Sequence, residues 1–360
     1  MRIELEKRSE RSRTLAWASP LIAVAATMVT GAIVFALLGK PPMKALWVFF
    51  VEPFSSLWSL EELVVKATPL ILIGVGLSVS YRANVWNIGA EGQLTVGALV
   101  GSAVPILFQS WNTPLTLVAM LALGIVGGMI WALIPAILKI RTGANEILVS
   151  LMLVYVAQLL LDWLVRGPWR DPHGYNFPKS VSFENWQTMP TIGDGRLNIG
   201  ILIALAVAVA LAVLMRRTIK GYEVRVMGEA PRAGRFAGFS SERMVMFSFL
   251  LSGGLAGLAG VIEVASTVGQ LQPNISPGYG FTAIIVAFLG RLDPLGVVVA
   301  ALMLAVSYLG GEAAQIALGI SDKAARVFQG ILLFWVLACD TLILYRPRLV
   351  WGTTTPEAAR

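Results

Sequence analysis

The 360-residue sequence is poor in the residues that build disulfide frameworks and metal sites. It contains one cysteine, Cys339, and one histidine, His173, which lies in a polar stretch. A disulfide within the chain needs two cysteines, and a structural zinc site usually needs four cysteine or histidine ligands. The sequence therefore predicts no disulfide, no bound metal and no histidine-based catalytic site.

Charged residues are also scarce. Asp, Glu, Lys and Arg make up 14% of the chain, whereas soluble domains carry about 25%. Hydrophobic residues make up 56%, and the mean hydropathy is +0.74. A soluble protein of this composition could not cover its surface with polar groups. The composition therefore predicts an integral membrane protein.

Ten apolar segments are predicted to be transmembrane helices, because about 20 mostly apolar residues cross a hydrocarbon core roughly 30 Å thick. No segment shows the alternation of a membrane barrel, so the predicted fold class is all-α. The eighth segment is expected to be a short or discontinuous helix around 277–290. The ten segments are Leu15–Leu38, Leu63–Ser80, Ile88–Phe108, Leu115–Leu138, Ile147–Val165, Ile199–Met215, Met244–Ala265, Phe281–Gly290, Pro294–Leu309 and Ala324–Leu344.

The distribution of Lys and Arg predicts the orientation. With the N-terminus in the cytoplasm, 19 of the 28 basic residues lie inside, and both termini are cytoplasmic. The net charge of +7 is then a topological signal, and nucleic-acid binding is not expected. The predicted layout is a basic tail over 1–14, one membrane domain over 15–345 and a cytoplasmic tail over 346–360. Within the domain, loop 166–197 is external and loop 216–243 is cytoplasmic.

The cytoplasmic loop predicts a short helix outside the membrane. Pro231 suits the first turn of a helix, and Gly238 suits the position just past its end. The helix of about two turns would have a small apolar face, formed by Ala233, Phe236 and Ala237, beside exposed arginines. Because 28 residues are long for a connector, we expect this loop to dock into a groove on a second protein. The alternative is a simple connector.

Polar residues within predicted helices indicate where a substrate passes, because such residues usually face a protein interior or a water-filled path. Residues 87–93 are polar, broken by glycine and placed at a helix start, which is typical of backbone that lines a cavity. The alternative for Glu91 is that it caps its own helix. The candidates for the path are Asn87, Glu91, Gln93, Asn145, Glu146, Gln270 and Asn274.

Four stretches, in order along about residues 15–345, resemble one family. Residues 228–239 read Gly-Glu-Ala-Pro-Arg-Ala-Gly-Arg-Phe-Ala-Gly-Phe, and residues 87–93 read Asn-Ile-Gly-Ala-Glu-Gly-Gln. Residues 142–147 read Thr-Gly-Ala-Asn-Glu-Ile, and residues 280–291 read Gly-Phe-Thr-Ala-Ile-Ile-Val-Ala-Phe-Leu-Gly-Arg. They resemble the membrane permeases of ATP-binding cassette (ABC) importers for simple sugars, nucleosides and branched-chain amino acids. The last two stretches are similar to the nucleoside branch, which uses a lipoprotein of the nucleoside-binding type.

The resemblance implies a permease of the bacterial inner membrane that moves a nucleoside, a purine nucleoside by preference, by alternating access. It implies cytoplasmic ATPase subunits, a second permease that is either related or identical, and an external binding protein. ATP and Mg²⁺ would bind the partners only, because this chain has no Gly-x-x-x-x-Gly-Lys-Ser/Thr loop and is not expected to be an enzyme. The residues expected to couple to the ATPase are Gly228, Glu229, Pro231, Arg232, Ala233, Arg235 and Gly238.

Three other functions remain open at this stage. A permease of the same family could carry a simple sugar such as a pentose. An ion-coupled secondary transporter would need carboxylates or histidines inside the membrane, and the polar residues here cluster near helix ends. A membrane enzyme would need a metal cluster or a nucleophile pair, and Cys339 and His173 are far apart in the sequence.

Overall fold

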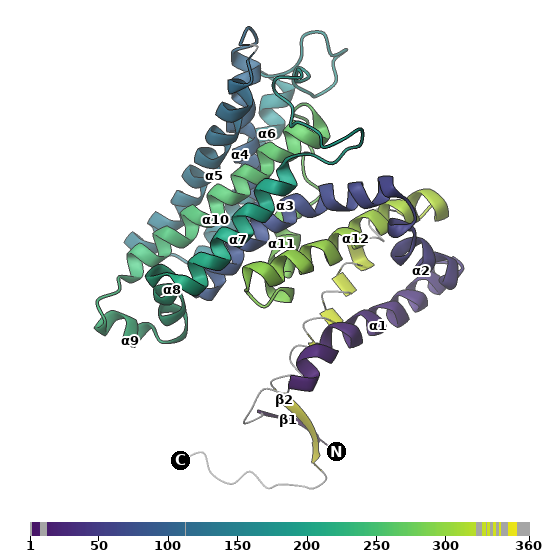
Figure 1. Ribbon diagram of the computed structural model, residues 1–360, viewed down its shortest axis with the longest axis vertical. Coiled ribbons are helices and arrows are strands. Elements are labelled where there is room, and N and C mark those ends of the chain that lie inside the picture. The colour runs from purple at the N-terminus through teal and green to yellow at the C-terminus, as the bar shows by residue number, and fades with distance from the viewer. Residues whose placement is uncertain are drawn as a thin grey trace. The chain divides into compact units, whose positions relative to one another are not determined.

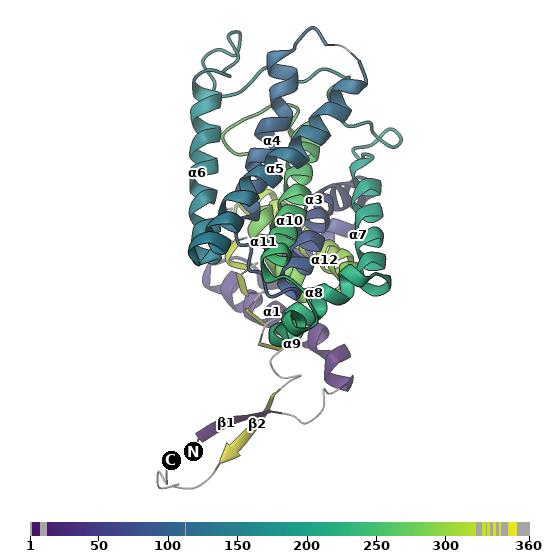
Figure 2. The same cartoon turned by 90° about the vertical axis from the view of Figure 1, so that its left-hand side faces the viewer.

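The computed structural model describes residues 2–7, 13–111, 113–321, 326–328, 330–331, 334–335, 338–339 and 345–350. The chain divides into two compact units, one formed by residues 1–53 with 307–360, and the other by residues 54–306. They are called unit 1 and unit 2 below, and Figures 1 and 2 show their elements. The elements are β1 (Arg2–Lys7), α1 (Arg13–Leu37), α2 (Pro42–Phe50), η1 (Glu52–Phe54), α3 (Leu57–Arg82), α4 (Ala90–Leu107), α5 (Leu115–Thr142), α6 (Glu146–Arg166), α7 (Gly200–Arg217), α8 (Ile219–Glu229), α9 (Pro231–Phe236), α10 (Ser241–Glu263), the π-helix η2 (Val264–Val268), α11 (Tyr279–Leu289), α12 (Pro294–Leu318) and β2 (Tyr345–Val350).

Seven helices in the described part of the chain are long and apolar enough to cross a membrane. They are α3, α4, α5, α6, α7, α10 extended through η2, and α12, and each coincides with a predicted segment. The segment 277–290 is short as predicted, because α11 has 11 residues and about 16 Å of length. The predicted first segment lies on α1, whereas the tenth, Ala324–Leu344, lies largely outside the described residues. The count of ten and the orientation stay predictions.

The centre of unit 2 is a close contact between α4, α5 and α10, which lie side by side in Figures 1 and 2. Gly97 of α4 lies against Gly257 of α10, and a Cβ atom built on Gly257 would overlap the carbonyl oxygen of Gly124 in α5. Gly128 of α5 faces Gly253 of α10 in the same way. Gly124 and Gly128 lie four residues apart on α5, as do Gly253 and Gly257 on α10, and small residues at this spacing allow helix backbones to approach.

Local signals set several helix ends. The side chain of Ser56 accepts a hydrogen bond from Ser59 N (3.1 Å) at the start of α3, and that of Ser240 accepts one from Arg243 N (3.3 Å) at the start of α10. Gly143, with φ +69°, ends α5 in the left-handed region. These caps fix where the apolar spans begin and where the polar connections start.

Unit 1 has its own aromatic core. The ring centroid of Phe328 lies 4.3 Å from that of Phe49 and 5.7 Å from that of Phe35. Leu318 of α12 belongs to the same cluster. This core includes the helix α2, which the sequence analysis did not predict.

The terminal strands of unit 1 form an antiparallel ladder in which Arg2 pairs with Val350 and Lys7 with Tyr345. This ladder was not predicted within the tails 1–14 and 346–360. It is compatible with the predicted even number of crossings, which stays a prediction.

We expect Gly257→Ala to lower the thermal unfolding midpoint of the detergent-solubilised protein. The added methyl group overlaps α5 backbone, and overpacking of this kind costs typically 1–3 kcal/mol. The matched control is Gly330→Ala, where a Cβ atom meets open space. If the Gly257→Ala protein had the same unfolding midpoint as the unmodified protein, the close contact between α5 and α10 would be contradicted.

Candidate functional site

Loop 216–243, which is predicted to be cytoplasmic, forms two helices, of which one was predicted from the sequence. Pro231 occupies the first turn of α9, and Gly238, with φ +86°, follows its end, as predicted. Phe239 N donates a hydrogen bond to the carbonyl oxygen of Gly234 (3.0 Å), which closes the turn. The preceding helix α8 was not predicted. Its first turn is capped by Thr218, whose hydroxyl accepts a bond from Gly221 N (3.2 Å).

Helix α9 presents a protruding surface with an aromatic tip. Phe236 is 95% exposed, and Gly234 is the buried position, packed against Met227 of α8. Figures 1 and 2 show α8 and α9 at one end of unit 2 and loop 166–197 at the other. We call the exposed α9 residues Pro231, Arg232, Ala233, Arg235 and Phe236 the docking face.

The other predicted coupling residues lie next to this face. Gly228 packs against the carbonyl oxygen of Arg82 at the end of α3, so that a side chain would not fit there. Glu229 is exposed at the end of α8. The structure thus brings all seven predicted coupling residues into one segment, while their role in coupling stays a prediction.

Asn87 and Gln93 form a closed amide pair in the interior of unit 2. Asn87 Nδ2 donates to Gln93 Oε1 (2.8 Å), and Gln93 Nε2 donates to Asn87 Oδ1 (3.0 Å). Asn87 Nδ2 also donates to Ser252 Oγ (2.9 Å), and both amide side chains are buried. Because buried polar groups must be satisfied, this network holds the entry to α4 on α10. Contact of these two residues with a substrate stays a prediction.

Glu91 joins two helix starts. It lies in the first turn of α4, and its Oε2 accepts a hydrogen bond from the backbone N–H of Gly280 in the first turn of α11 (2.6 Å). Gly280 lies so close to Glu91 backbone that a Cβ atom would overlap it. The positive ends of two helices therefore face one carboxylate. A cap for α4 alone was the alternative predicted for Glu91, because the packing of α11 cannot be read from the sequence.

A cavity of about 500 Å³ opens beside Glu91. We call it the outer cavity, because its lining includes Arg166, where the loop predicted to be external begins. It lies between α4, α6 and the segment that leads into α11. Polar groups line it on all three sides, and an ion pair joins Asp162 to Arg166 (2.7 Å) on α6. The lining residues are Glu91, Thr95, Tyr155, Gln158, Leu159, Leu161, Asp162, Arg166, Pro273, Asn274, Ile275 and Ser276.

Two of the seven predicted path residues, Glu91 and Asn274, lie in this lining. The polar stripe of α6, formed by Tyr155, Gln158 and Arg166, was not predicted from the sequence. The spacing of positions 155, 158, 162 and 166 places them on one helix face, and polar residues on one face of an apolar span are the signal that could have found them.

The remaining predicted path residues lie outside the cavity lining. Asn145 caps α6 by accepting a bond from Ile147 N (2.9 Å), and Glu146 pairs with Lys139 at the end of α5. Gln270 accepts a bond from Ser182 of loop 166–197 (3.2 Å). These contacts give the three residues structural partners, and a role in transport stays a prediction.

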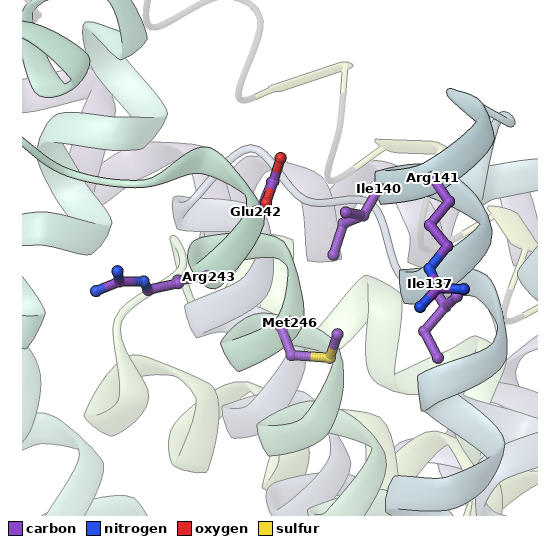
Figure 3. Close-up of a pocket in the computed structure, with 6 residues that line it drawn as sticks. All are labelled: Ile137, Ile140, Arg141, Glu242, Arg243 and Met246. Atoms are coloured by element: carbon purple, nitrogen blue, oxygen red, sulfur yellow. The ribbon is translucent and has the colours of Figure 1, made fainter.

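A second cavity, of about 410 Å³, lies where the end of α5 and the start of α10 diverge. Its floor is apolar, formed by Ile137, Ile140 and Met246. Figure 3 shows Met246 pointing toward the α5 residues, whereas Arg243 points away from them. Because the charged groups at its rim do not converge, this cavity suits a polar cargo less well than the outer cavity does.

Loop 166–197 packs on the far end of α10. Phe183 N donates to the carbonyl oxygen of Gly269 (2.7 Å), and Met189 N donates to that of Ala265 (2.9 Å). The loop leaves aromatic side chains in solvent, including Tyr175, which is 94% exposed, and Phe177. In the described part of the chain, no cluster of three or more His, Cys, Asp or Glu side chains could hold a metal ion.

Comparison with known proteins finds permeases of transport systems. Residues 59–337 match the family described as branched-chain amino acid transport system, permease component. The chain is 36% identical to the glucose ABC transporter permease protein TsgB13 of Haloferax volcanii, over 96% of this chain and 93% of that protein. It is 29% identical to the guanosine permease NupP of Bacillus subtilis (94% and 97%) and 27% identical to the nucleoside permease NupB of Lactococcus lactis (88% and 89%).

We expect Glu91→Ala to lower the thermal unfolding midpoint, because the buried N–H of Gly280 loses its acceptor. An unsatisfied buried group costs about 1–3 kcal/mol. Glu91→Gln retains an acceptor oxygen, so its unfolding midpoint should lie between those of Glu91→Ala and the unmodified protein. Glu229→Ala, at an exposed position, is the control and should melt like the unmodified protein. Equal midpoints for Glu91→Ala and the control would refute the bridging role.

Proposed function

This chain belongs to the permease family of branched-chain amino acid transport systems, and on that premise we propose that it carries a nucleoside into the cell. It is the permease subunit of an ABC transporter of the sugar and nucleoside type, which is a transport component and not an enzyme. The proposal extends to the inner membrane of a bacterium as its location and to alternating access as its mechanism.

The docking face supports the proposed attachment of ATPase subunits. An isolated aromatic side chain exposed to 95% is suited to insertion in a groove of a second protein, with arginines beside it to fix the orientation. In this proposal, ATP and Mg²⁺ bind the partner. Closure of the ATPase pair then moves α9 and shifts unit 2 between two packings.

The α6 stripe supports a second permease at the outer cavity. Gln158 is exposed on α6, a mostly apolar helix of 21 residues. An amide side chain that faced lipid there would lack hydrogen-bond partners, which is energetically costly. A second copy or a related permease would cover this face and enclose the outer cavity as a water-filled path. Cargo would enter from an external binding protein, for which the aromatic side chains of loop 166–197 offer a contact surface.

The lining of the outer cavity is the observation that carries the choice of cargo. Gln158 and Asn274 offer amide groups that can bond the hydroxyls of a ribose, and Tyr155 offers a ring on which a base can stack. A second candidate is a sugar, because a relative with 36% identity is named a glucose permease. The sugar would use the same amides and would not need Tyr155.

We expect Phe236→Ala to weaken binding of the ATPase subunits to the purified permease. Loss of a hot-spot aromatic costs about 2 kcal/mol, or roughly a 30-fold rise in Kd. Gly238→Val should have a similar effect, because φ +86° strains a branched residue. Tyr175→Ala, at the opposite end of unit 2, is the control. Unchanged ATPase binding by Phe236→Ala would rule out the docking face.

Uptake of labelled guanosine and labelled glucose into proteoliposomes that contain the full transporter distinguishes the two cargoes. We expect guanosine uptake, and Tyr155→Ala should raise its KM roughly tenfold, because stacking of a base contributes about 1–3 kcal/mol. Tyr155→Phe should keep the unmodified KM. The control is Val156→Ala, at an exposed position outside the cavity lining. Glucose uptake that is independent of Tyr155 would favour the sugar.

A further inference from the structure

The helix α11 is bound at its C-terminal end to the segment that carries the docking face. Arg216, in the last turn of α7 and just before α8, donates from Nη2 to Asp293 Oδ1 (3.0 Å) and Oδ2 (3.1 Å). Asp293 closes the turn between α11 and α12. Arg82 Nη1 also donates to the carbonyl oxygen of Leu292 in this turn (3.4 Å). A displacement of α8 and α9 would therefore also displace the turn that follows α11.

At its other end, α11 is bound to the wall of the outer cavity. The N–H of Gly280 donates to Glu91, and Ser276 Oγ accepts bonds from Gly278 N (3.1 Å) and Tyr279 N (3.0 Å). Glu91 and Ser276 both line the outer cavity. Movement of the first turn of α11 would therefore reshape that cavity directly.

The helix between these two ends is short and is bounded by unusual backbone. It measures about 16 Å over its 11 residues. Gly278 precedes it with φ +104°, and Arg291 and Leu292 follow it, each with φ +55°. Because the chain leaves helical geometry at both ends, α11 can shift as one body against α3. Its last turn rests on α3 through Phe288, whose ring stacks on Tyr81 with centroids 5.3 Å apart.

We infer that α11 transmits movement between the docking face and the outer cavity, with Arg216, Asp293 and Glu91 as positioning residues. The inference rests on the proposed function. If ATPase closure alters the shape of the outer cavity through α11, then cargo in the cavity alters ATPase engagement by the same free energy, because coupling between binding sites is reciprocal. None of the three residues needs to touch cargo or nucleotide for this role.

The Arg216–Asp293 pair is partly exposed, and such pairs contribute little to folding stability. Removal of one partner therefore leaves a folded permease in which the connection between α7 and α11 is weakened. Asp293→Asn is the suitable change, because asparagine keeps the cap of α12, where Asp293 Oδ2 accepts a bond from Gly296 N (3.3 Å). The expected defect is in coupling and not in stability.

The test measures ATP hydrolysed per cargo molecule imported, in proteoliposomes that contain the complete transporter. We expect Asp293→Asn and Arg216→Gln each to raise this ratio about fivefold or more, with unchanged thermal midpoints. The matched control is Glu223→Gln. This change removes the ion pair between Glu223 and Lys220, which has a similar length (2.9 Å) but lies wholly within α8. The control should keep the unmodified ratio.

A double-mutant cycle tests the two ends of α11 together. Distant and independent sites give additive effects, so Glu91→Gln with Asp293→Asn should be clearly non-additive if one helix connects them. Additive effects, or an unchanged ratio in Asp293→Asn with normal uptake, would overturn this inference alone. Absence of ATP-dependent uptake by the unmodified complex would overturn the proposed function, and this inference with it.

Discussion

The close approach of α4, α5 and α10 is the constraint on which the rest of unit 2 depends. Glycines at the contact let backbone meet backbone, which a single added methyl group would prevent. In a membrane, helices gain little from hydrophobic burial against one another, so dense van der Waals packing of this kind supplies much of the association. The three helices therefore form a stable frame against which shorter elements can be positioned.

The functional features lie where the chain departs from this frame. The outer cavity opens beside the segment between η2 and α11, which has no helical hydrogen bonds of its own to satisfy its backbone. Non-helical backbone at membrane depth is tolerated where it lines a water-filled space or is buried in protein. Glu91 accepts a backbone hydrogen bond at the start of α11, so this predicted path residue also holds one wall of the outer cavity.

Much of the architecture could be predicted from the sequence. Long apolar runs identified the seven helices of the described chain that are long and apolar enough to span a membrane, and Pro231 with Gly238 identified α9. These signals are local and do not depend on distant residues. The helices α2 and α8 were missed, because α2 is mostly apolar but only nine residues long, and α8 mixes apolar and charged residues. Of the candidate path residues, Glu91 and Asn274 reach the outer cavity, whereas Asn87 and Gln93 bond each other.

The sequence by itself determined that the chain resides in a membrane, which apolar segments are long enough to cross it, and where the short helix α9 begins and ends. Hydropathy, charge and helix-end residues act over a few turns, so they are legible without a structure. Only the tertiary structure decided that α6 contributes the polar stripe of the outer cavity, that Glu91 bonds α11, and that Arg216 meets Asp293. Each of these arrangements depends on elements that are distant in the sequence. The packing of glycine against backbone, which brings the helices into register, is a property of the folded chain.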